Sequence, residues 1–470
     1  MLALSLLLSC SPPPAPSPVV QPAPRAPALE RSVPLPRVEL PDMKATLDAL
    51  PAEIPAGRAG LSAAELLLER PEPPVAALSA YLDGLLTQGH IDLLGGGLFG
   101  PQGEKALADN ARLLQISAAT AALSGEQRHA ALARSTADYI LRDLRAPSGG
   151  YWHSEAPSEF GEFYAWDPVE LQTLLGPEAA PLLAHAQLSD SGQLQATDPD
   201  ILLDAATRSA LLRLFGARLE RLPPPTDARV MAADNGLLLR ALSVSGALLG
   251  EPAHLSAAED LAQILTTTEL NTQGQPLAGP SFTAAGLLSL NEALPDPRWL
   301  LAAQGLAPKL RAGLSEPPPP QDGALPSAWG EAVIVLHRLS LLGAPGSSSE
   351  LSSLLGPGLP ALQTDVLACG AMSRAVLELQ RPAVEVVIAS DKEDPTLPFW
   401  IAAFHTSWRP GVRLAVTRQE PELAQFSALS GKLPGPTGPR AYVCVGASCG
   451  LPSGTLEGFI QALEPLSAIP

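Results

Sequence analysis

Asp234-Asn-Gly-Leu-Leu-Leu-Arg-Ala-Leu-Ser-Val-Ser-Gly-Ala-Leu-Leu249 is the clearest helical segment of the chain. From Leu238 to Leu249 an apolar or small residue recurs every three or four positions, which is the spacing of one helix face. Asp234 is a residue type that caps helix starts, so we expect it at the N-cap. The turn Gly250-Glu-Pro follows, and Pro252–Leu265 then has the pattern of a partner helix. The segment therefore predicts a helical hairpin.

The same hairpin pattern recurs on both sides of this segment. Leu107–Leu123 pairs with Arg128–Leu144, Thr283–Ala293 pairs with Arg298–Leu310, and a further helix is expected over Gly330–Leu341. Hairpins repeated at intervals of roughly 40–60 residues favour a helical array or toroid over a four-helix bundle. No runs of β-branched residues alternate with these helices, so we exclude a continuous parallel sheet. A mainly α domain is therefore predicted for residues 42–382.

The pattern changes in residues 383–470, where short β-branched runs alternate with helical segments. We expect strands at Val384–Ala389, Val412–Thr417 and Ala441–Val445. Helices are expected at Leu397–His405, Glu420–Ser430 and Leu456–Leu463. Such alternation predicts a small C-terminal α/β module packed on the helical body.

The first 41 residues differ from both regions. Residues 1–9 are largely apolar, and Leu7-Leu-Ser-Cys10 resembles the lipobox of bacterial lipoproteins, in which the cysteine is acylated. Residues 10–41 carry 11 prolines and few large apolar side chains, which is typical of an extended, disordered spacer. We therefore expect a signal peptide over 1–9, lipidation at Cys10, a tether over 10–41, and a lipid-anchored place in the bacterial cell envelope. An incidental apolar N-terminus is the alternative.

The charge of the chain limits its partners. It has 30 Lys and Arg against 48 Asp and Glu, a formal net charge of -18. Nucleic acids and anionic lipid surfaces need clustered basic residues, so we exclude them as main partners. The membrane is expected to be a partner only through the lipid anchor.

Several segments, in order, resemble the bacterial YyaL family, whose animal members are called spermatogenesis-associated protein 20. They are Gly89-His-Ile-Asp-Leu-Leu-Gly-Gly-Gly97, Glu104-Lys105 with Asp109-Asn110, Gly149-Gly-Tyr-Trp152, Gly161-Glu-Phe-Tyr-Ala-Trp-Asp-Pro-Val-Glu-Leu171, Asp234-Asn-Gly236, Asp322-Gly-Ala-Leu-Pro-Ser327 and, in the closing region, Glu385-Val-Val-Ile388 and Ala441-Tyr-Val-Cys-x4-Cys449. The resemblance runs from about residue 75 to the end. It implies a six-hairpin, glycosidase-like (α/α)6 toroid, complete or incomplete, and thus a link to carbohydrate metabolism.

Departures from the family pattern imply that polar residues of the family's site are missing from this chain. Full-length members carry an N-terminal thioredoxin-like domain, whereas this sequence has no Cys-x-x-Cys, so redox chemistry of that kind is not expected. Where the family has Phe-His-Arg-Tyr, this chain has Leu98-Phe-Gly-Pro-Gln-Gly103, and an Asp-Asp-Tyr segment becomes Ala278-Gly-Pro280. These loops would rim the central cleft of a toroid. The helix-packing residues remain while polar groups of the cleft are lost.

No catalytic residue is assigned from the sequence, but the rim positions supply candidates for a ligand cleft. They are Glu104, Asp109, Asn110, Trp152, His153, Tyr164, Trp166, Asp227, Asn235 and Trp329. Each has a structural alternative. The aromatic stretch Tyr151–Trp166 could fold back as a small core of its own, His153 could be a loop histidine, and Asp109 and Asn235 could tie loops to the backbone.

Metal and cofactor sites are not predicted. Cys444 and Cys449 stand as Cys-x4-Cys with no histidine or third thiol nearby in sequence, so a zinc site is not expected. In an exported protein these cysteines would form a local disulfide, and in a cytosolic one they would be two structural thiols.

Three functions remain open from the sequence. The favoured one is a non-catalytic relative of the toroid family, a pseudoenzyme that binds a saccharide or a protein partner in the cleft. The second is an active carbohydrate-processing enzyme, either a glycoside hydrolase or a sugar isomerase or epimerase. The third is a scaffold without a small-molecule ligand.

Overall fold

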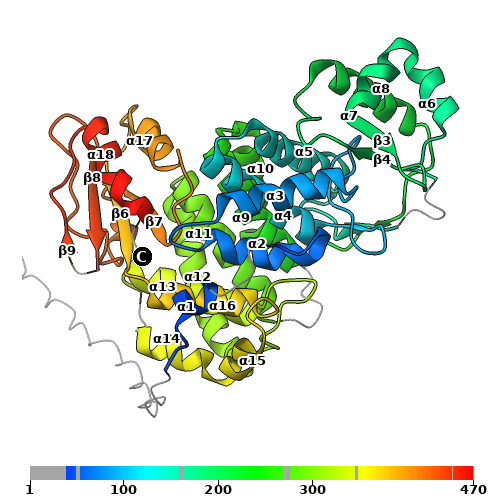
Figure 1. Ribbon diagram of the computed structural model, residues 1–470. Coiled ribbons are helices and arrows are strands. Elements are labelled where there is room, and N and C mark those ends of the chain that lie inside the picture. The colour runs from blue at the N-terminus through cyan, green and yellow to red at the C-terminus, as the bar shows by residue number, and fades with distance from the viewer. Residues whose placement is uncertain are drawn as a thin grey trace, which may run out of the picture. The chain divides into compact units, whose positions relative to one another are not determined.

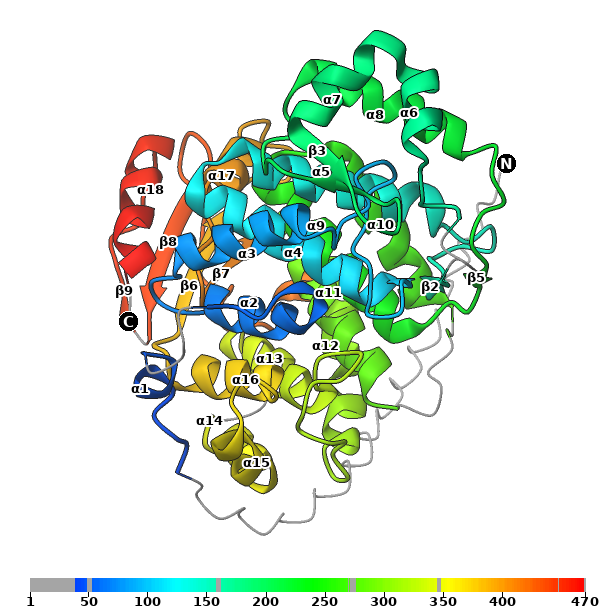
Figure 2. The ribbon, with the colours of Figure 1, turned by 45° about the vertical axis from the view of Figure 1, so that its right-hand side comes forward.

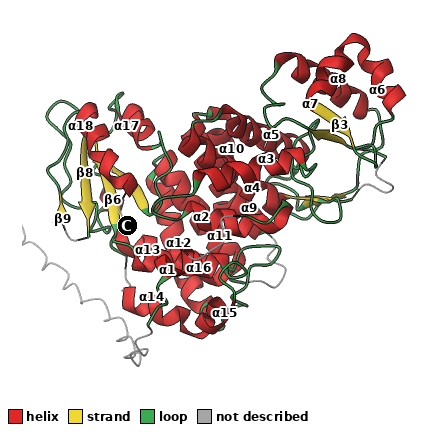
Figure 3. Cartoon of the chain, in the orientation of Figure 1, coloured by secondary structure: helices red, strands yellow, loops and turns green. Residues whose placement is uncertain are grey.

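The computed structural model describes residues 39–48, 53–157, 162–268, 270, 276–344, 348–446 and 448–468. The expected signal peptide, the lipidation site Cys10 and all but the last three residues of the tether lie outside this range. Residues 37–470 form a single compact unit. Figure 3 shows that helices make up most of it and that the strands are few and short. No helix within the described residues is long and apolar enough to cross a membrane.

A closed ring of six inner helices forms the body of the described structure. Each inner helix contacts the next, and the last contacts the first. In ring order they are α2 (Leu61–Leu68), α4 (Leu107–Ser124), α9 (Ala232–Leu249), α11 (Ala278–Ala293), α13 (Ala328–Leu341) and α16 (Gly370–Gln380). The predicted toroid is therefore observed.

Outer helices alternate with the inner ones along the chain and pack against them (Figure 1). They are α1 (Met43–Asp48), α3 (Val75–Thr87), α5 (Gln127–Asp143), α10 (Pro252–Thr267), α12 (Pro297–Gly313) and α14 (Ser348–Leu355), with the short α15 (Leu359–Thr364) after α14. The two sets differ in burial. In α4 every residue from Leu107 to Ala121 is buried, whereas in α5 buried residues recur every three or four positions. Small and apolar side chains on all sides place a helix inside, and an amphipathic pattern places it outside.

Glycines set the close spacing of the inner helices. A Cβ on Gly236 of α9 would lie 2.5 Å from the backbone of Phe282 and Thr283 in α11, and one on Gly330 of α13 would lie 2.5 Å from the backbone of Ala371 in α16. Only glycine permits such backbone approach at these positions. The glycine of the Asp234-Asn-Gly motif thus has a packing role.

Two helix starts differ from the predictions. Helix α9 begins at Ala232 with Met231 as its N-cap, so Asp234 is the third helical residue and not the cap, because its carboxylate is bonded elsewhere. Helix α11 begins at Ala278, five residues before the predicted start at Thr283. The Ala-Gly-Pro stretch that stands in place of a polar loop is therefore the first turn of an inner helix.

An insertion between α5 and α9 has no counterpart in the predicted hairpin series. It contains α6 (Pro168–Leu175), α7 (Ala179–His185), the antiparallel pair β3 (Ala186–Leu188) and β4 (Leu194–Ala196), and α8 (Ala205–Arg218). Its buried leucines share a core with α3 and α4. Figure 2 shows the three helices grouped together. A second small sheet, β1 (Lys105–Ala106), β2 (Ser154–Glu155) and β5 (Thr226–Asp227), joins three loops next to α4 and α9.

The C-terminal module has the strands that the sequence predicts. The sheet order is β7-β6-β8-β9, with β6 (Val384–Ala389) parallel to β7 (Val412–Thr417) and antiparallel to β8 (Arg440–Val445), which pairs with β9 (Ser448–Cys449). Helices α17 (Leu397–Phe404) and α18 (Leu456–Leu463) also match the prediction.

Alternate residues of β6 face two different cores. Val386 and Ile388 pack with α17 and α18, whereas Val387 belongs to the core of the ring, as expected for side chains that alternate across a strand. The predicted helix over Glu420–Ser430 is wrong. Only the short 3-10 helix Pro421–Leu423 forms, and the following turns bury Phe426 and Leu429 against the ring core.

Candidate functional site

The N-terminal ends of α4 and α9 carry the same Asp-Asn pair at the third and fourth helical positions. Asn110 accepts a hydrogen bond from the Leu98 amide at 2.7 Å and donates to the Ala106 carbonyl at 2.9 Å. Asn235 accepts from the Tyr151 amide at 2.8 Å and donates to the Tyr151 carbonyl at 3.0 Å. Both asparagines are fully buried and tie a loop to an inner helix. The structural interpretation of Asn235 is confirmed.

The aspartates of the two pairs each bind a basic side chain. Asp109 accepts from Arg58 Nε at 2.5 Å, and its other oxygen is buried without a hydrogen-bond partner among the described residues. Burial raises the pKa of Asp109. Asp234 lies 2.5 Å from His153 Nδ1, and this hydrogen bond raises the pKa of His153. His153 is about one-third exposed, so a buried carboxylate orients an accessible imidazole.

A third carboxylate, Asp322, lies near the same end of the ring. One of its oxygens accepts from the amides of Ser327 and Ala371 at 3.0 and 3.2 Å, which holds the loop before α13 against α16. Its other oxygen is buried without a hydrogen-bond partner among the described residues. Burial raises the pKa of Asp322.

The aromatic stretch surrounds buried cations. Lys105 is 1% exposed, and its Nζ lies 4.1 Å from the centre of the Tyr139 ring and 5.1 Å from that of Tyr164. Lys105 Nζ also lies 3.1 Å from Asp92, which binds Arg218 at 2.8 Å. Tyr164 is thus the ring of the stretch that packs on Lys105, together with Tyr139 of α5, whereas Tyr151 and Trp166 belong to the two large cores, so the stretch does not form a small core of its own.

The remaining predicted residues are placed separately. Trp166 is buried under Arg221, whose guanidinium carbon lies 3.9 Å from the ring centre. Trp329 is 3% exposed and donates to the Leu354 carbonyl at 3.0 Å, as a core residue does. Trp152 is half-buried.

Two predicted acids make local contacts only. Glu104 accepts from the Gln102 amide at 2.9 Å, and Asp227 binds Arg229, whose Nε lies 2.7 Å away. Phe160, from the same aromatic stretch as Trp166, lies outside the described residues. Of the predicted residues, His153 and Asp227 thus lie together, beside Asp234, with the His153 amide 3.1 Å from the Asp227 carbonyl, whereas Trp166 and Trp329 belong to two separate cores.

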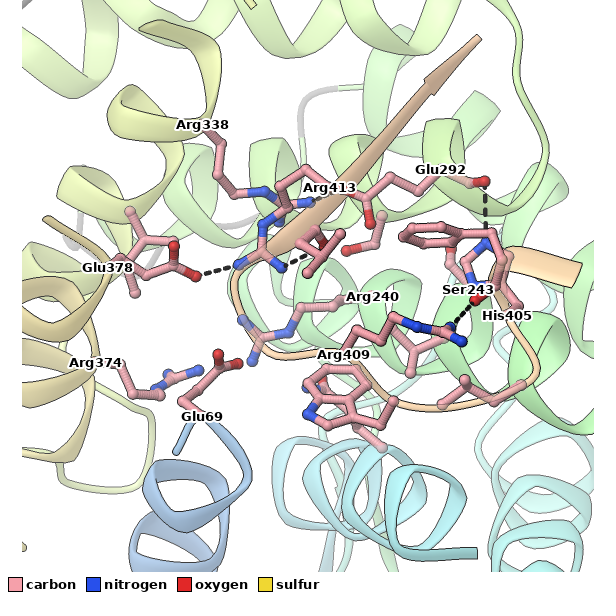
Figure 4. A pocket seen from close by; sticks show the side chains of 18 of the residues that line it. Glu69, Arg240, Ser243, Glu292, Arg338, Arg374, Glu378, His405, Arg409 and Arg413 are labelled. Carbon is pink, nitrogen blue, oxygen red and sulfur yellow. Dashed lines mark hydrogen bonds and ion pairs between the residues drawn. The ribbon is translucent and has the colours of Figure 1, made fainter. Parts of the chain in front are cut away.

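A cavity of about 80 Å³ lies at the other end of the ring, where the segment between α17 and β7 covers the inner helices (Figure 4). Trp408 in this segment donates to the Leu68 carbonyl of α2 at 2.9 Å, and His405 bonds the Glu292 carbonyl of α11 at 3.2 Å. Arg413 binds Glu378 of α16. The segment is therefore fixed to two inner helices and the following strand β7 to a third, and together they cover the ring at this end.

Charged side chains from the inner helices and the covering segment line the cavity. They are Arg240, Arg338, Arg374, Arg409, Arg413, Glu69, Glu292, Glu331 and Glu378. Arg240 lies 2.7 Å from Glu331, Arg374 lies 3.3 Å from the same glutamate, and all three are at most 6% exposed. The axis of the ring thus contains a network of buried ion pairs.

Sequence reasoning missed this network. Its signal was present as single arginines in otherwise apolar helices, such as Arg240 within Leu237-Leu-Leu-Arg-Ala-Leu242. A charge in a helix that is buried on all sides needs a buried partner. Periodicity cannot say which residue, far along the chain, supplies it.

Two further features concern the cysteines and metals. Cys444 and Cys449 are directly opposed on β8 and β9 and form a disulfide, which agrees with the prediction for an exported protein. No group of three or more His, Cys, Asp or Glu that could hold a metal ion occurs among the residues that the structure describes.

Comparison with known proteins supports the family resemblance. The human spermatogenesis-associated protein 20 is 26% identical, over 75% of this chain and 57% of its own length, and the rat protein is 25% identical, over 71% and 53%. The chain therefore spans about half the length of the curated relatives it matches. No protein-family model matches the chain.

Among solved structures, a family 76 glycoside hydrolase from a bovine Bacteroides thetaiotaomicron strain aligns with a TM-score of 0.33 and 13% identity, over 62% of this chain and 52% of its own. The sequence similarity is the more extensive of the two relationships. The chain is thus similar to spermatogenesis-associated protein 20 over about three quarters of its length, which confirms the resemblance that its motifs indicated.

Proposed function

We propose that this chain is a non-catalytic binding protein of the toroid type, whose ligand occupies the cavity at the covered end of the ring. The observation that carries this proposal is the cavity of about 80 Å³, lined by polar and charged groups from the inner helices and the covering segment and by apolar side chains such as Leu248 and Ile334. Concave sites in which a few polar groups converge are where globular proteins usually bind small ligands.

The arrangement at the opposite end favours binding over catalysis. Glycoside hydrolysis needs two carboxylates that face each other across the scissile bond. Here Asp109 is engaged by Arg58, Asp234 by His153, and Asp322 by two backbone amides. Intramolecular partners thus occupy the carboxylates at the rim.

The test is a thermal-shift screen of the purified chain against neutral saccharides, acidic saccharides and small anions. A ligand that binds the folded state stabilises it by RT ln(1 + L/Kd), where L is the free ligand concentration, so the melting temperature rises as L exceeds Kd. Ser289→Leu fills the cavity with a larger apolar side chain, because Ser289 lines it. Ser340→Leu, also on an inner helix but outside the lining, is the matched control.

Abolition of the shift in Ser289→Leu but not in Ser340→Leu is the expected result. A shift that survives in both variants would contradict binding in the cavity. Absence of any shift across the whole screen would favour the scaffold function.

We further propose that the protein is anchored in the bacterial cell envelope through lipidated Cys10, which lies outside the described residues. Support comes from the lipobox-like sequence, the proline-rich stretch after it, and the disulfide at Cys444, which suits an oxidising compartment. Cys10→Ser is expected to move the protein from the membrane fraction to the soluble fraction. An unchanged distribution between the membrane and soluble fractions would contradict the anchoring proposal.

A carbohydrate-processing enzyme is the second candidate, because burial raises the pKa of both Asp109 and Asp322 and leaves one oxygen of each without a hydrogen-bond partner among the described residues. A carboxyl group with a raised pKa can act as a general acid. This candidate would be supported if the wild type hydrolysed aryl glycosides and Asp322→Asn abolished the hydrolysis. Activity that Asp322→Asn leaves unchanged would exclude Asp322 as the acid.

A further inference from the structure

We infer that the cavity binds a small oxyanion, of the size of phosphate, sulfate or acetate, with Arg409 as its principal ligand. This inference rests on the binding function proposed above and names the chemical class of the ligand. It is argued from the balance of charge, the supply of hydrogen-bond donors and the volume of the cavity.

The lining has an excess of positive charge. Five arginines and four glutamates face the cavity; outside the lining, Arg381 binds Glu69 and Glu65 lies 3.9 Å from Arg240, so the excess of one positive charge rests on Arg409. A buried charge without a counter-charge is costly, and proteins compensate it with a partner or an ion. An anion in the cavity would compensate the excess.

Arg409 is the cation without a carboxylate partner among the described residues. Its Nη1 donates to the carbonyls of Phe404 and Ser407, at 2.5 and 3.3 Å, and no carboxylate ion pair involves it. Burial lowers the pKa of Arg409. At Arg374, in contrast, burial also lowers the pKa, but the carboxylates of Glu65 and Glu331 outweigh it and the pKa is raised.

Spare hydrogen-bonding groups around the cavity are donors. The Nε atoms of Arg240, Arg374, Arg409 and Arg413 are buried without partners among the described residues. None of the four lining glutamates has a buried oxygen without a partner in the same part of the chain. These Nε atoms have almost no accessible surface, so the donors that can face an anion are the terminal Nη groups of the arginines, and an oxyanion supplies several acceptors in one group. Water can accept these bonds too, but it cannot neutralise the charge.

The volume of the cavity limits the size of the ligand. A single water needs about 10–15 Å³ on this measure. A cavity of about 80 Å³ therefore accommodates several waters or one small oxyanion. The covering segment is fixed by Trp408 and His405, so we expect the anion itself to be the ligand and not a phosphorylated sugar.

The test is isothermal titration calorimetry of the full chain with inorganic phosphate in a buffer without other oxyanions. Arg409→Met removes the principal ligand and keeps an apolar stem of similar length, and it is expected to weaken phosphate binding at least tenfold. Arg298→Met is the matched control, because Arg298 is 57% exposed and pairs with Asp296 on the surface. It is expected to leave binding unchanged.

A variant with the opposite expected effect guards against loss of binding through misfolding. Glu292→Gln removes a negative charge from the lining and frees Arg338, which it binds at 2.5 Å. Phosphate should therefore bind several-fold more tightly to Glu292→Gln than to the wild type. Weaker or equal binding by a folded Glu292→Gln protein would overturn the charge argument.

Further titrations distinguish the classes of ligand, and they distinguish failure of this inference from failure of the proposed function. Sulfate and acetate should compete with phosphate, whereas glucose 6-phosphate should not. Phosphate binding that Arg409→Met leaves intact would overturn the inference, since the anion would then bind elsewhere. If a neutral saccharide binds and Ser289→Leu blocks it while phosphate gives no heat, the inference fails and the proposed function stands. If no ligand of either class binds, both fail.

Discussion

Replacement of Glu331 by glutamine is the most direct test of the charged ring axis. Glu331 is 1% exposed and lies between two guanidinium groups, Arg240 at 2.7 Å and Arg374 at 3.3 Å. Glutamine has nearly the same shape but no charge. The substitution therefore removes the nearer of two buried carboxylates from Arg240 and Arg374, leaving Glu65, which lies 3.9 Å from Arg240, and adds little change in packing.

The magnitude follows from the geometry. Unit charges about 4 Å apart attract by about 4 kcal/mol at an effective dielectric constant of about 20, and Glu331 makes two such contacts. Burying the Glu331 carboxylate costs desolvation free energy in the wild type. Glutamine avoids this cost, which offsets part of the lost attraction. Breaking buried pairs by removal of one partner costs about 3–5 kcal/mol, and we expect a loss of this size in the free energy of unfolding.

The assay is equilibrium denaturation in urea at pH 7, followed by circular dichroism and by tryptophan fluorescence, so that a two-state transition can be checked. Glu259→Gln is the matched control, because it removes an exposed partner 3.6 Å from Arg298, and it should cost less than about 1 kcal/mol. A loss of less than about 1 kcal/mol for Glu331→Gln would refute the reasoning. It would mean that water or a bound ion already balances the two arginines.

Three further predictions concern the loops, the pH dependence and the disulfide. Asn110→Ala and Asn235→Ala should each lower the free energy of unfolding by about 2–3 kcal/mol, because each leaves buried backbone groups unpaired; a clear inequality in urea denaturation would show that the two asparagines are not equivalent. The raised pKa of His153 should stabilise the fold fully below about pH 6.5, its usual value, and the effect should vanish as pH rises through the folded pKa. The unfolding free energy of wild type minus His153→Gln, measured from pH 5 to 9, should therefore fall with pH, and a difference that grows would contradict this sign. Reduction of the bridge between Cys444 and Cys449 should cost about 2 kcal/mol, as expected for a short loop, and equal stability with and without dithiothreitol would count against it.

The sequence was informative about elements and about the loops next to them. Alternation of β-branched residues located β6 and β7 to the residue, and hairpin periodicity located α4, α5 and α10 within a few residues. Interpretation of Asn235 as a residue that ties a loop was also correct. Glu420–Ser430 was misread, because Leu423, Phe426 and Leu429 recur every three residues as on a helix face, whereas a 3-10 helix and turns bring them to the ring core.

The candidate site could not be read in the same way. His153 could be singled out as a functional candidate, but its partner Asp234 was assigned to a helix cap. Arg409 was not singled out at all. Its surroundings come from helices up to 340 positions away along the chain, as the bond from Trp408 to the Leu68 carbonyl shows.

Local pattern was sufficient for a mainly α chain of hairpins with a small α/β end, because hydrophobic period and turn residues act over a few positions. Closure of the ring depends on α16 meeting α2, and the cavity depends on the covering segment lying across the helix ends. Both arise from contacts between residues hundreds of positions apart. A buried arginine in a leucine-rich helix indicates that a counter-charge exists. Only the packed structure shows that Glu331 lies between Arg240 and Arg374. Only the packed structure, likewise, leaves Arg409 without a carboxylate partner among the residues it describes.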